Sequence, residues 1–213
     1  MKLTVLGCGG GIGSGRHTTC FQLDDDVLID AGTGITALSL EQLAKIDHVF
    51  LTHSHLDHVL GLPLLVDAVG DRRDKPVVVH ALPDTLEILA QHVFNWKLWP
   101  DFREIPDASA PWLKFERMPL GSEVRLGGRT IGSLPAHHAV PACGYRFSNG
   151  RQSLVFTGDA NSGFYHIGAD NIGLALNGAK VLDFKTTATG FNATPSAWGS
   201  GTYALDVGTG SAF

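Results

Sequence analysis

Four potential metal ligands lie within six positions of this 213-residue chain: His53, His55, Asp57 and His58. They follow the apolar, β-prone stretch 49–51, so they lie where a buried strand should end. The first two point the same way in extended chain, because side chains alternate with a period of two. The chain then turns toward a helix-compatible stretch that begins near Val59, which lets the last two face the same pocket. Three imidazoles and a carboxylate suit zinc, manganese or iron, whereas a solvated histidine-rich loop would produce this order only rarely.

Two downstream segments fit the same pocket. Residues 135–141 form a loop bounded by prolines that carries His137 and His138. Residues 153–156 form another apolar strand, and this strand is followed by Gly158 and Asp159. Functional groups gather at the carboxyl ends of strands in an open sheet, so Asp159 is placed to reach the histidine run. A carboxylate there can bridge two cations at the spacing of roughly 3.5–4 Å that two-metal hydrolases use.

These motifs resemble the metallo-β-lactamase superfold. The resemblance rests on H-S-H-L-D-H-V-L-G-L-P-L-L from residue 53, H-H-A-V-P-A-C-G-Y-R-F from residue 137 and L-V-F-T-G-D from residue 154. Within the superfold, the chain is most similar to the class II cyclic-nucleotide phosphodiesterases. The opening M-K-L-T-V-L-G-C-G-G-G-I-G, V-L-I-D-A-G-T-G from residue 27 and F-N-W-K-L-W-P-D-F from residue 94 favour that branch. The resemblance covers about residues 1–160 and implies an αββα sandwich with two divalent cations, Zn²⁺ first, with Mn²⁺ or Fe²⁺ as alternatives.

The resemblance also implies roles for individual residues. One cation would use His53, His55 and His138. The second would use Asp57 and His58, with Asp159 bridging both. His138 is preferred to His137 because it stands six positions before Gly144-Tyr145-Arg146, as the ligand does in the related tRNA 3′-processing branch. Asp57 is the expected catalytic residue, because it would orient or deprotonate the attacking water while it touches the second metal.

The chain departs from the family after Asp159. The family has a seventh ligand, a histidine on a late strand-to-loop turn, and a further helix and strands that complete the second half of the sandwich. The only later histidine here is His166, and its context, G-F-Y-H-I-G, does not match. We therefore expect a sandwich that is incomplete at its C-terminus, a weakened second metal site and reduced activity.

Residues 161–213 have a different composition. They contain no Arg and no Glu, and Gly, Ala, Thr and Asn dominate. The stretch 167–184 indicates two short strands around Asn177-Gly178, a type I′ hairpin signal. This part is similar to modules repeated in bacteriophage tail-fibre proteins, and the alternative is a Gly-rich extension of no defined kinship. We expect a hydrolase domain over residues 1–160 and a Gly-rich, β-prone tail over residues 161–213, with no trusted pattern after residue 187.

Composition limits the partners and the setting. The net charge of −5 gives no reason to expect nucleic-acid binding by electrostatics. No apolar run approaches the roughly 20 residues that span a membrane, and the N-terminal apolar stretch is too short for a signal peptide. The three cysteines have no paired spacing, which favours reduced thiols and a cytoplasmic setting. We expect a small-molecule phosphodiester as partner, no membrane and no nucleic acid, with a homo-oligomer left open.

Apolar periodicity and turn residues predict a layered α/β sandwich. Strands are expected at 3–6, 19–23, 27–30, 49–52, 77–80, 114–117, 123–126, 129–134, 144–147 and 153–156, the last five in a second sheet. Helices are expected at 40–46, 61–69 and 83–94, the last of which has Pro83 near its first turn.

Three features have competing interpretations. The glycine loop 7–13 matches neither G-x-G-x-x-G nor a P-loop, so we expect it at the rim of the metal pocket rather than on a nucleotide cofactor. Asp30 is expected to fix loops under the site rather than to bind metal. The aromatic residues between 94 and 102 could stack a purine base or could form a packed helix end, and the sequence favours neither.

The function expected is hydrolysis of a phosphodiester, most of all a 3′,5′-cyclic nucleotide (cAMP or cGMP) to the 5′-nucleotide. One alternative is another hydrolase of the superfold, either a tRNA 3′-processing endonuclease or a thioester or lactone hydrolase. The tRNA enzyme normally adds an exosite arm and a basic surface, and neither is evident in the sequence. The other alternative is an inactive fusion with a phage structural segment, which the tail favours.

Overall fold

The computed structural model describes residues 1–159, 163–166, 171–176 and 179–185. Its first sheet has six strands in sequence order: β1 (Leu3–Gly7), β2 (Cys20–Leu23), β3 (Val27–Ile29), β4 (His48–Phe50), β5 (Val77–Ala81) and β6 (Leu113–Arg117). Strands β1 to β3 pair antiparallel, whereas β3 to β6 are parallel. The carboxyl ends of β3 and β4 therefore lie side by side, with Ile29 opposite Phe50.

The second sheet is antiparallel throughout. Its strands run in the order β10 (Ser153–Phe156), β9 (Ala142–Ser148), β8 (Arg129–Ala136) and β7 (Glu123–Leu126). The β9–β10 connection is the expected Asn149-Gly150 turn, in which Gly150 has a φ of +82°. The connection from β8 to β9, residues 137–141, lies at the opposite end of the sheet and carries the histidine pair.

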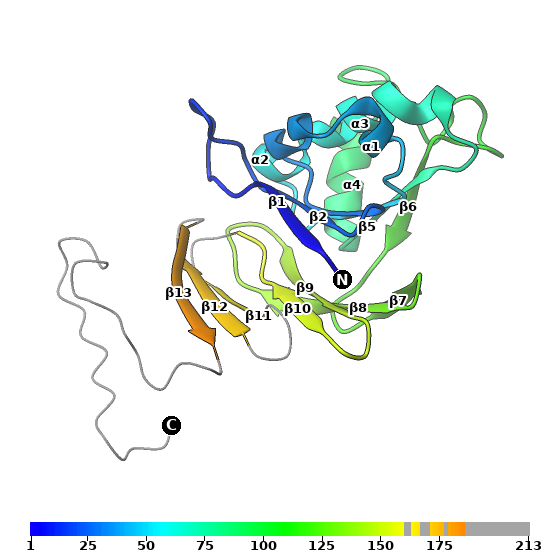
Figure 1. Ribbon diagram of the computed structural model, residues 1–213. Coiled ribbons are helices and arrows are strands. Elements are labelled where there is room, and N and C mark those ends of the chain that lie inside the picture. The colour runs from blue at the N-terminus through cyan, green and yellow to red at the C-terminus, as the bar shows by residue number, and fades with distance from the viewer. Residues whose placement is uncertain (160–162, 167–170, 177–178, 186–213) are drawn as a thin grey trace, which may run out of the picture.

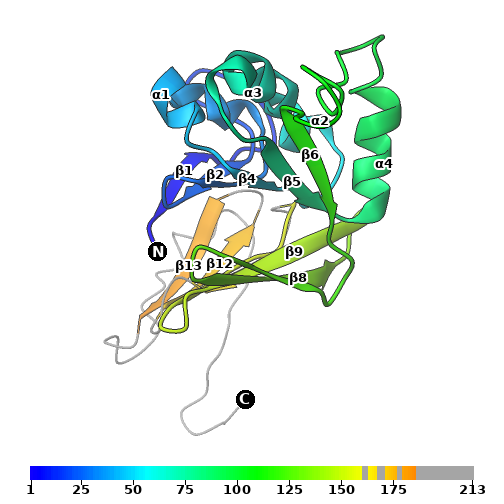
Figure 2. The ribbon, with the colours of Figure 1, turned by 90° about the vertical axis from the view of Figure 1, so that its right-hand side faces the viewer.

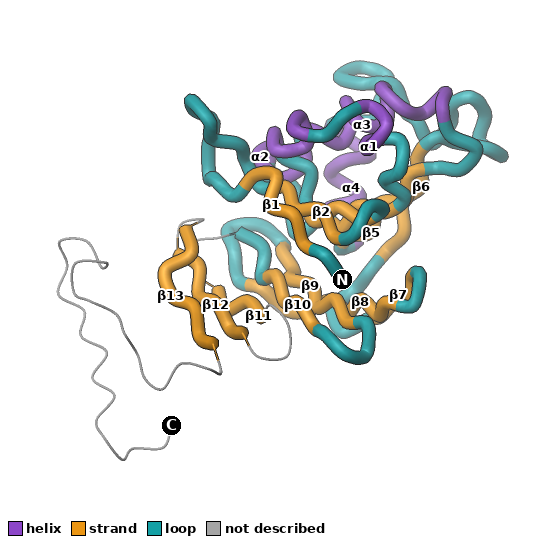
Figure 3. Tube along the Cα trace, in the orientation of Figure 1, coloured by secondary structure: helices purple, strands orange, loops and turns teal. Residues whose placement is uncertain are grey.

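All helices in the described part of the chain precede β6. They are the 3-10 helices Thr33–Ala37 and Gly70–Arg72 and the α-helices α1 (Leu40–Leu43), α2 (Leu56–Val59), α3 (Gly61–Val69) and α4 (Pro83–His92). Figure 3 shows the helices on one face of the first sheet, and the second sheet faces the other side. None of these helices is long and apolar enough to cross a membrane.

Figure 1 shows three layers, and two apolar clusters hold them together. One lies between the helices and the first sheet, where Val49, Leu62 and Val79 are inaccessible to solvent. The other lies between the two sheets, where Phe50 packs edge-on against Phe147 with ring centroids 5.4 Å apart. Strand β4 therefore contributes to both clusters, Val49 to one and Phe50 to the other, because successive side chains of a strand point to opposite faces.

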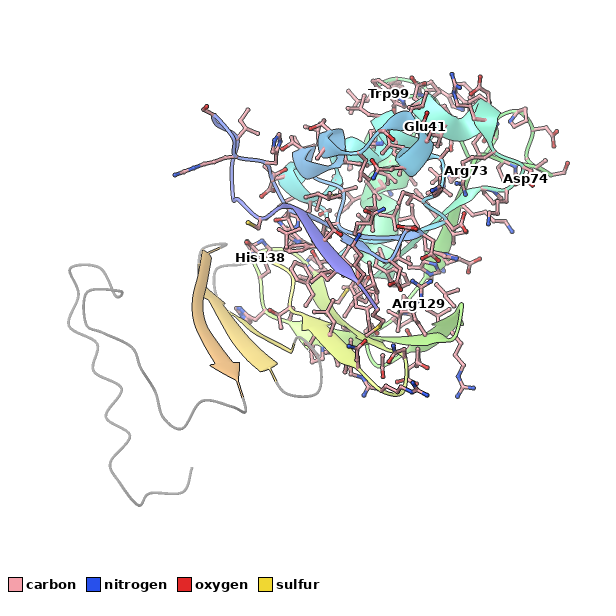
Figure 4. All side chains as sticks on the ribbon, in the orientation of Figure 1. Glu41, Arg73, Asp74, Trp99, Arg129 and His138 are labelled. Atoms are coloured by element: carbon pink, nitrogen blue, oxygen red, sulfur yellow. The ribbon has the colours of Figure 1, made fainter. Side chains whose placement is uncertain are left out.

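An ion pair joins the two sheets at one edge. Arg129, at the start of β8, donates to Asp26 in the β2–β3 turn at 2.9 Å and 2.5 Å and to Asp24 at 3.2 Å. The guanidinium is almost fully buried. Figure 4 labels Arg129 between the two sheets and, away from it, His138 in the β8–β9 connection, residues 137–141, which we call the histidine loop.

A third sheet follows the second. It contains β11 (Gly163–His166), β12 (Asn171–Leu176) and β13 (Ala179–Lys185), all antiparallel, and β11 lies beside β10. The hairpin expected on either side of residues 177–178 is confirmed by the β12–β13 pairing. The turn itself and residues 187–213 lie outside the described residues, and the tail-fibre resemblance stays a prediction.

The layered α/β sandwich is confirmed, with three local corrections. Strand β6 belongs to the first sheet and not to the second, because it pairs in parallel with β5 after the α4 crossover. Helix α1 ends at Leu43 rather than Ile46, and Ile46 is buried in the core. Helix α2 begins at Leu56, so the last two ligand candidates of the histidine run already lie in a helix that was expected only from Val59.

Candidate metal centre

The histidine run lies where parallel strands end. After β4 the chain has no regular secondary structure up to His55, whose φ of −65° and ψ of 146° are extended, and α2 begins at Leu56. The neighbouring β3 ends at Ile29, and Asp30 follows it with a φ of +56°. In the second sheet, Gly158 follows β10 with a φ of +84°. A Cβ on Gly158 would lie 3.3 Å from both the Cys143 carbonyl and the Thr52 side chain, so the turn brings Asp159 close to the run.

Three imidazoles converge in this region. One donor atom each of His53, His55 and His138 can be chosen such that all lie within 4.8 Å of one another. His55 Nδ1 is 3.1 Å from His53 Nε2 and also 3.1 Å from His138 Nε2. The sequence pattern predicted this group, although 83 residues separate His55 from His138.

Buried hydrogen bonds orient two of the rings. Thr52 donates its backbone N–H to Asp30 at 2.8 Å and its hydroxyl to the same carboxylate at 2.9 Å. The hydroxyl proton is therefore committed, so the contact of 3.0 Å with His53 Nδ1 requires that nitrogen to donate. Asp30 also accepts from His58 Nδ1 at 2.8 Å. In its neutral form, each of these two histidines therefore has Nε2 as its lone-pair nitrogen.

Two carboxylates lie close to the histidines. Asp57 Oδ2 lies 3.6 Å from His58 Nε2, and its side chain is partly open to solvent. Asp159 Oδ2 lies 3.2 Å from His138 Nε2. All six residues expected as ligands thus lie in one region, three of them as a tight imidazole group and three around it. Their assignment as ligands stays a prediction.

The electrostatics of the two buried rings differ. Burial and the neighbouring His58 lower the pKa of His53 to about 4, so its imidazole is neutral near pH 7. Burial also opposes protonation of His58, but the Asp30 carboxylate outweighs that effect and raises the pKa of His58. A neutral imidazole with a free Nε2 is the form that binds a metal.

The donor set fits a divalent cation. A ring nitrogen carries either one proton or one lone pair, so His55 Nδ1 can take part in only one hydrogen bond. Two ring nitrogens, His53 Nε2 and His138 Nε2, nevertheless lie 3.1 Å from it. A cation shared by the three nitrogens would satisfy all of them. Nitrogen and carboxylate oxygen donors together suit zinc, with manganese and iron as alternatives.

A pocket of about 530 Å³ opens onto this region. It is lined on one side by the histidine loop, including His137 and His138, and on the other by Thr157 and Asp159. His137 is exposed and lies outside the imidazole group. The pocket gives a small substrate access to the Asp159 side of the group.

Other candidates from the sequence lie elsewhere. Phe94 and Phe102 are buried, with ring centroids 6.2 Å apart, which supports the packed helix end rather than base stacking for these two residues. Figure 4 places Trp99 far from His138. The glycine loop does not appear among the residues that line the 530 Å³ pocket. Sequence reasoning missed the role of Thr52, whose only signal was its position directly before the first histidine.

The fold and this site define the class as a layered α/β protein with a histidine- and carboxylate-lined centre at the strand ends. Residues 25–196 match the family described as Beta-lactamase superfamily domain. The chain therefore belongs to the metallo-β-lactamase superfamily, whose members are metal-dependent hydrolases. The matched range runs past residue 160 into the expected tail.

Relatives of two activities match the chain. Ribonuclease Z of Bradyrhizobium diazoefficiens is 35% identical over 116 residues, which cover 53% of this chain and 36% of the relative. A probable 3′,5′-cyclic-nucleotide phosphodiesterase of Yersinia pestis is 37% identical over 60 residues, 28% of this chain and 16% of the relative. The chain spans about half or less of the length of the curated relatives that it matches. Unliganded yeast PDE1 shares the fold, with a TM-score of 0.62 and 20% identity over 74% of this chain and 64% of that one.

Proposed function

We propose that this metallo-β-lactamase-fold hydrolase acts on a phosphodiester, and that its substrate is a 3′,5′-cyclic nucleotide, cAMP or cGMP, which it opens to the 5′-nucleotide. The observation that carries the proposal is the convergence of His53, His55 and His138, the last of which lines a pocket together with Asp159. The local similarity to a probable cyclic-nucleotide phosphodiesterase supports the choice of substrate.

In this proposal the residues hold two divalent cations, Zn²⁺ in the first instance. His53, His55 and His138 would hold one, Asp57 and His58 would hold the other, and Asp159 would serve both. Two bound cations supply Lewis acidity at the phosphoryl oxygens and a nucleophile at neutral pH, because they lower the pKa of water.

The chain's own residues then position the reaction. Asp57 is partly exposed at the first turn of α2, where it can accept a proton from the attacking water and orient it. Asp30 and Thr52 fix the rings behind the site, so the donor nitrogens keep their directions during turnover. The pocket of about 530 Å³ would admit the substrate so that its phosphoryl group lies at His138 and Asp159, in line with attack.

A second candidate is 3′ processing of tRNA precursors. It is favoured by the ribonuclease Z relative, whose alignment is about twice as long as that of the phosphodiesterase. The net charge of −5 weighs against it, because a polyanionic substrate is held mainly by Lys and Arg. A thioester or lactone hydrolase and an inactive fusion are the remaining alternatives from the sequence.

One assay separates these candidates. Purified protein loaded with zinc is incubated with cAMP and, separately, with a tRNA precursor that carries a 3′ trailer. His55→Ala is the matched control, because it removes one member of the imidazole group. Turnover of cAMP that is lost in the variant supports the proposal, and processing of the precursor alone favours the second candidate. Turnover of neither substrate contradicts both.

We infer further that residues 1–160 form the hydrolase domain and residues 161–213 form a separate tail. All six expected ligands lie within the first segment, which supports the division. Limited proteolysis followed by mass spectrometry tests it, since cleavage confined to the stretch after residue 160 is expected.

The three cysteines are unpaired, which supports the proposal of a cytoplasmic setting. A homo-oligomer would appear as a larger mass in light scattering.

A further inference from the structure

A second depression lies on the other side of the histidine loop. It has a volume of about 630 Å³ and is bounded by the start of α4, the β6–β7 connection and the loop itself. Figure 2 shows the corresponding end of α4 beside the ends of β8 and β9. We call this depression the α4 groove; its apolar walls are Leu82, Pro83, Pro119, Leu120, Ala136, Ala139, Val140, Pro141 and Ala142.

The α4 groove adjoins the pocket at the candidate metal centre, with the histidine loop between them. Ala136, His137, His138, Ala139 and Ala142 line both the groove and the 530 Å³ pocket that Asp159 borders. Three of these five residues are alanines with short side chains, so His137 and His138 are the only large side chains that the two spaces share. A molecule whose phosphoryl group lies at His138 and Asp159 can therefore extend an attached group into the groove.

The lining decides which group fits. Besides its nine apolar residues the groove has only Asp84, His137 and His138 as polar members, and no Lys or Arg. A further phosphate would meet the Asp84 carboxylate with no cation to balance it. Ligand sites that take uncharged organic groups have this composition, with apolar walls and a few polar groups that fix orientation.

We propose that the α4 groove binds the uncharged aromatic or heteroaromatic substituent of a small phosphodiester, and that Leu120 is a specificity-determining residue. The inference rests on the proposed phosphodiesterase function and adds the substrate class, a phosphodiester with one ring substituent and no further phosphate. Asp84 accepts a hydrogen bond from an amino group on the ring. A polynucleotide, whose substituents carry further phosphates, is excluded from the groove.

Binding of two phosphonates tests the groove without turnover. Phenylphosphonate and methylphosphonate have the same anionic head and differ only in the ring, and each is titrated calorimetrically into the zinc-loaded full chain. We expect phenylphosphonate to bind about tenfold more tightly than methylphosphonate. Leu120→Asp should reduce that preference to about twofold or less. Leu120 is 52% exposed, so the variant should fold.

The matched control is Leu98→Asp. Leu98 is 64% exposed and does not line the groove, so its variant should keep the tenfold preference. Equal binding of the two phosphonates by the unaltered chain, or a preference that Leu120→Asp leaves intact, overturns the inference. Failure of both phosphonates to bind overturns it as well.

Hydrolysis of cAMP by the same samples separates this inference from the function on which it rests. A ring preference without turnover of any phosphodiester overturns the proposed function and leaves the groove assignment supported. Turnover of cAMP with no ring preference overturns the groove assignment and supports the function. Loss of turnover in Leu120→Asp together with the lost preference supports both.

Discussion

Asp30 Oδ2 lies 2.8 Å from His58 Nδ1, and both side chains are buried beneath the candidate metal centre. The same carboxylate accepts both the backbone N–H and the hydroxyl of Thr52. One buried anion therefore sets the orientation of His58 directly and that of His53 through Thr52. An aspartate outside the expected ligand set thus controls how two of its members present their nitrogens.

Replacing this anion should weaken metal binding without removing a ligand. In Asp30→Asn the His58 ring loses its charged acceptor, so we expect zinc affinity to fall about 10- to 100-fold. Competition with a chromogenic chelator measures the change. Asp71→Asn, at an exposed position, is the matched control and should bind zinc as the unaltered chain does. Unchanged affinity in Asp30→Asn would show that the hydrogen bond serves stability alone.

The roles of these residues as ligands stay a prediction, which rested on local signals for the histidine run and on the family resemblance for His138. The histidine run followed an apolar strand, and period-two alternation put His53 and His55 on one side. The sequence also predicted a supporting role for Asp30. It did not predict the part played by Thr52, because a threonine at the end of a strand is common and its committed hydroxyl proton depends on a carboxylate 22 residues away.

A buried histidine, His80, should make the fold sensitive to acid. His80 Nε2 lies 3.1 Å from His48 Nδ1, and the His80 ring stacks on Phe50 at 4.4 Å. Burial, with His48 nearby, lowers the pKa of His80 to about 4. Since the unfolded chain takes up the proton near pH 6.5, stability is lost as pH falls from 6.5 toward 4. The loss due to His80 should be roughly 3 kcal/mol.

Urea unfolding of His80→Phe across this pH range tests the effect. The phenyl ring can keep the stacking on Phe50 but cannot titrate, so stability should fall less steeply between pH 6.5 and pH 4 than in the unaltered chain. Excess chelator in every sample removes the contribution of metal binding. His92→Gln, at the exposed end of α4, should keep the original pH dependence. Identical slopes for His80→Phe and the unaltered chain would contradict the assignment.

The fold was predictable where a pattern lay within one element. The segments 61–69, 123–126 and 153–156 were predicted with their observed boundaries. Strand β6 was assigned to the wrong sheet because strand order depends on contacts across the α4 crossover, which no local pattern encodes. Three of its five residues, Lys114, Glu116 and Arg117, are exposed, as in an edge strand, and an edge strand fits either sheet.

The ion pair that joins the sheets should contribute measurably to stability. Arg129→Ala leaves Asp24 and Asp26 without their buried partner, so we expect the free energy of unfolding to fall by about 1–3 kcal/mol. The exposed pair between Arg146 and Glu123 gives the comparison, and Arg146→Ala should cost about 0–1 kcal/mol. Chemical denaturation at pH 7 measures both variants. Equal losses of unfolding free energy in the two variants would mean that burial of the Arg129 guanidinium does not strengthen its ion pair.

The two halves of the candidate centre should bind metal unequally. His53, His55 and His138 already place their donor atoms within 4.8 Å, whereas no such group within the described residues includes Asp57, His58 or Asp159. We therefore expect one tight and one weaker zinc site in a chelator titration, with affinities that differ about tenfold or more. His55→Ala should lose the tight site.

Asp57→Asn should keep the tight site and lose turnover about 10²- to 10⁴-fold, because the proton acceptor is removed. His17→Gln, at an exposed position, is the control for both. Two equally tight sites, or full turnover in Asp57→Asn, would contradict this division of roles.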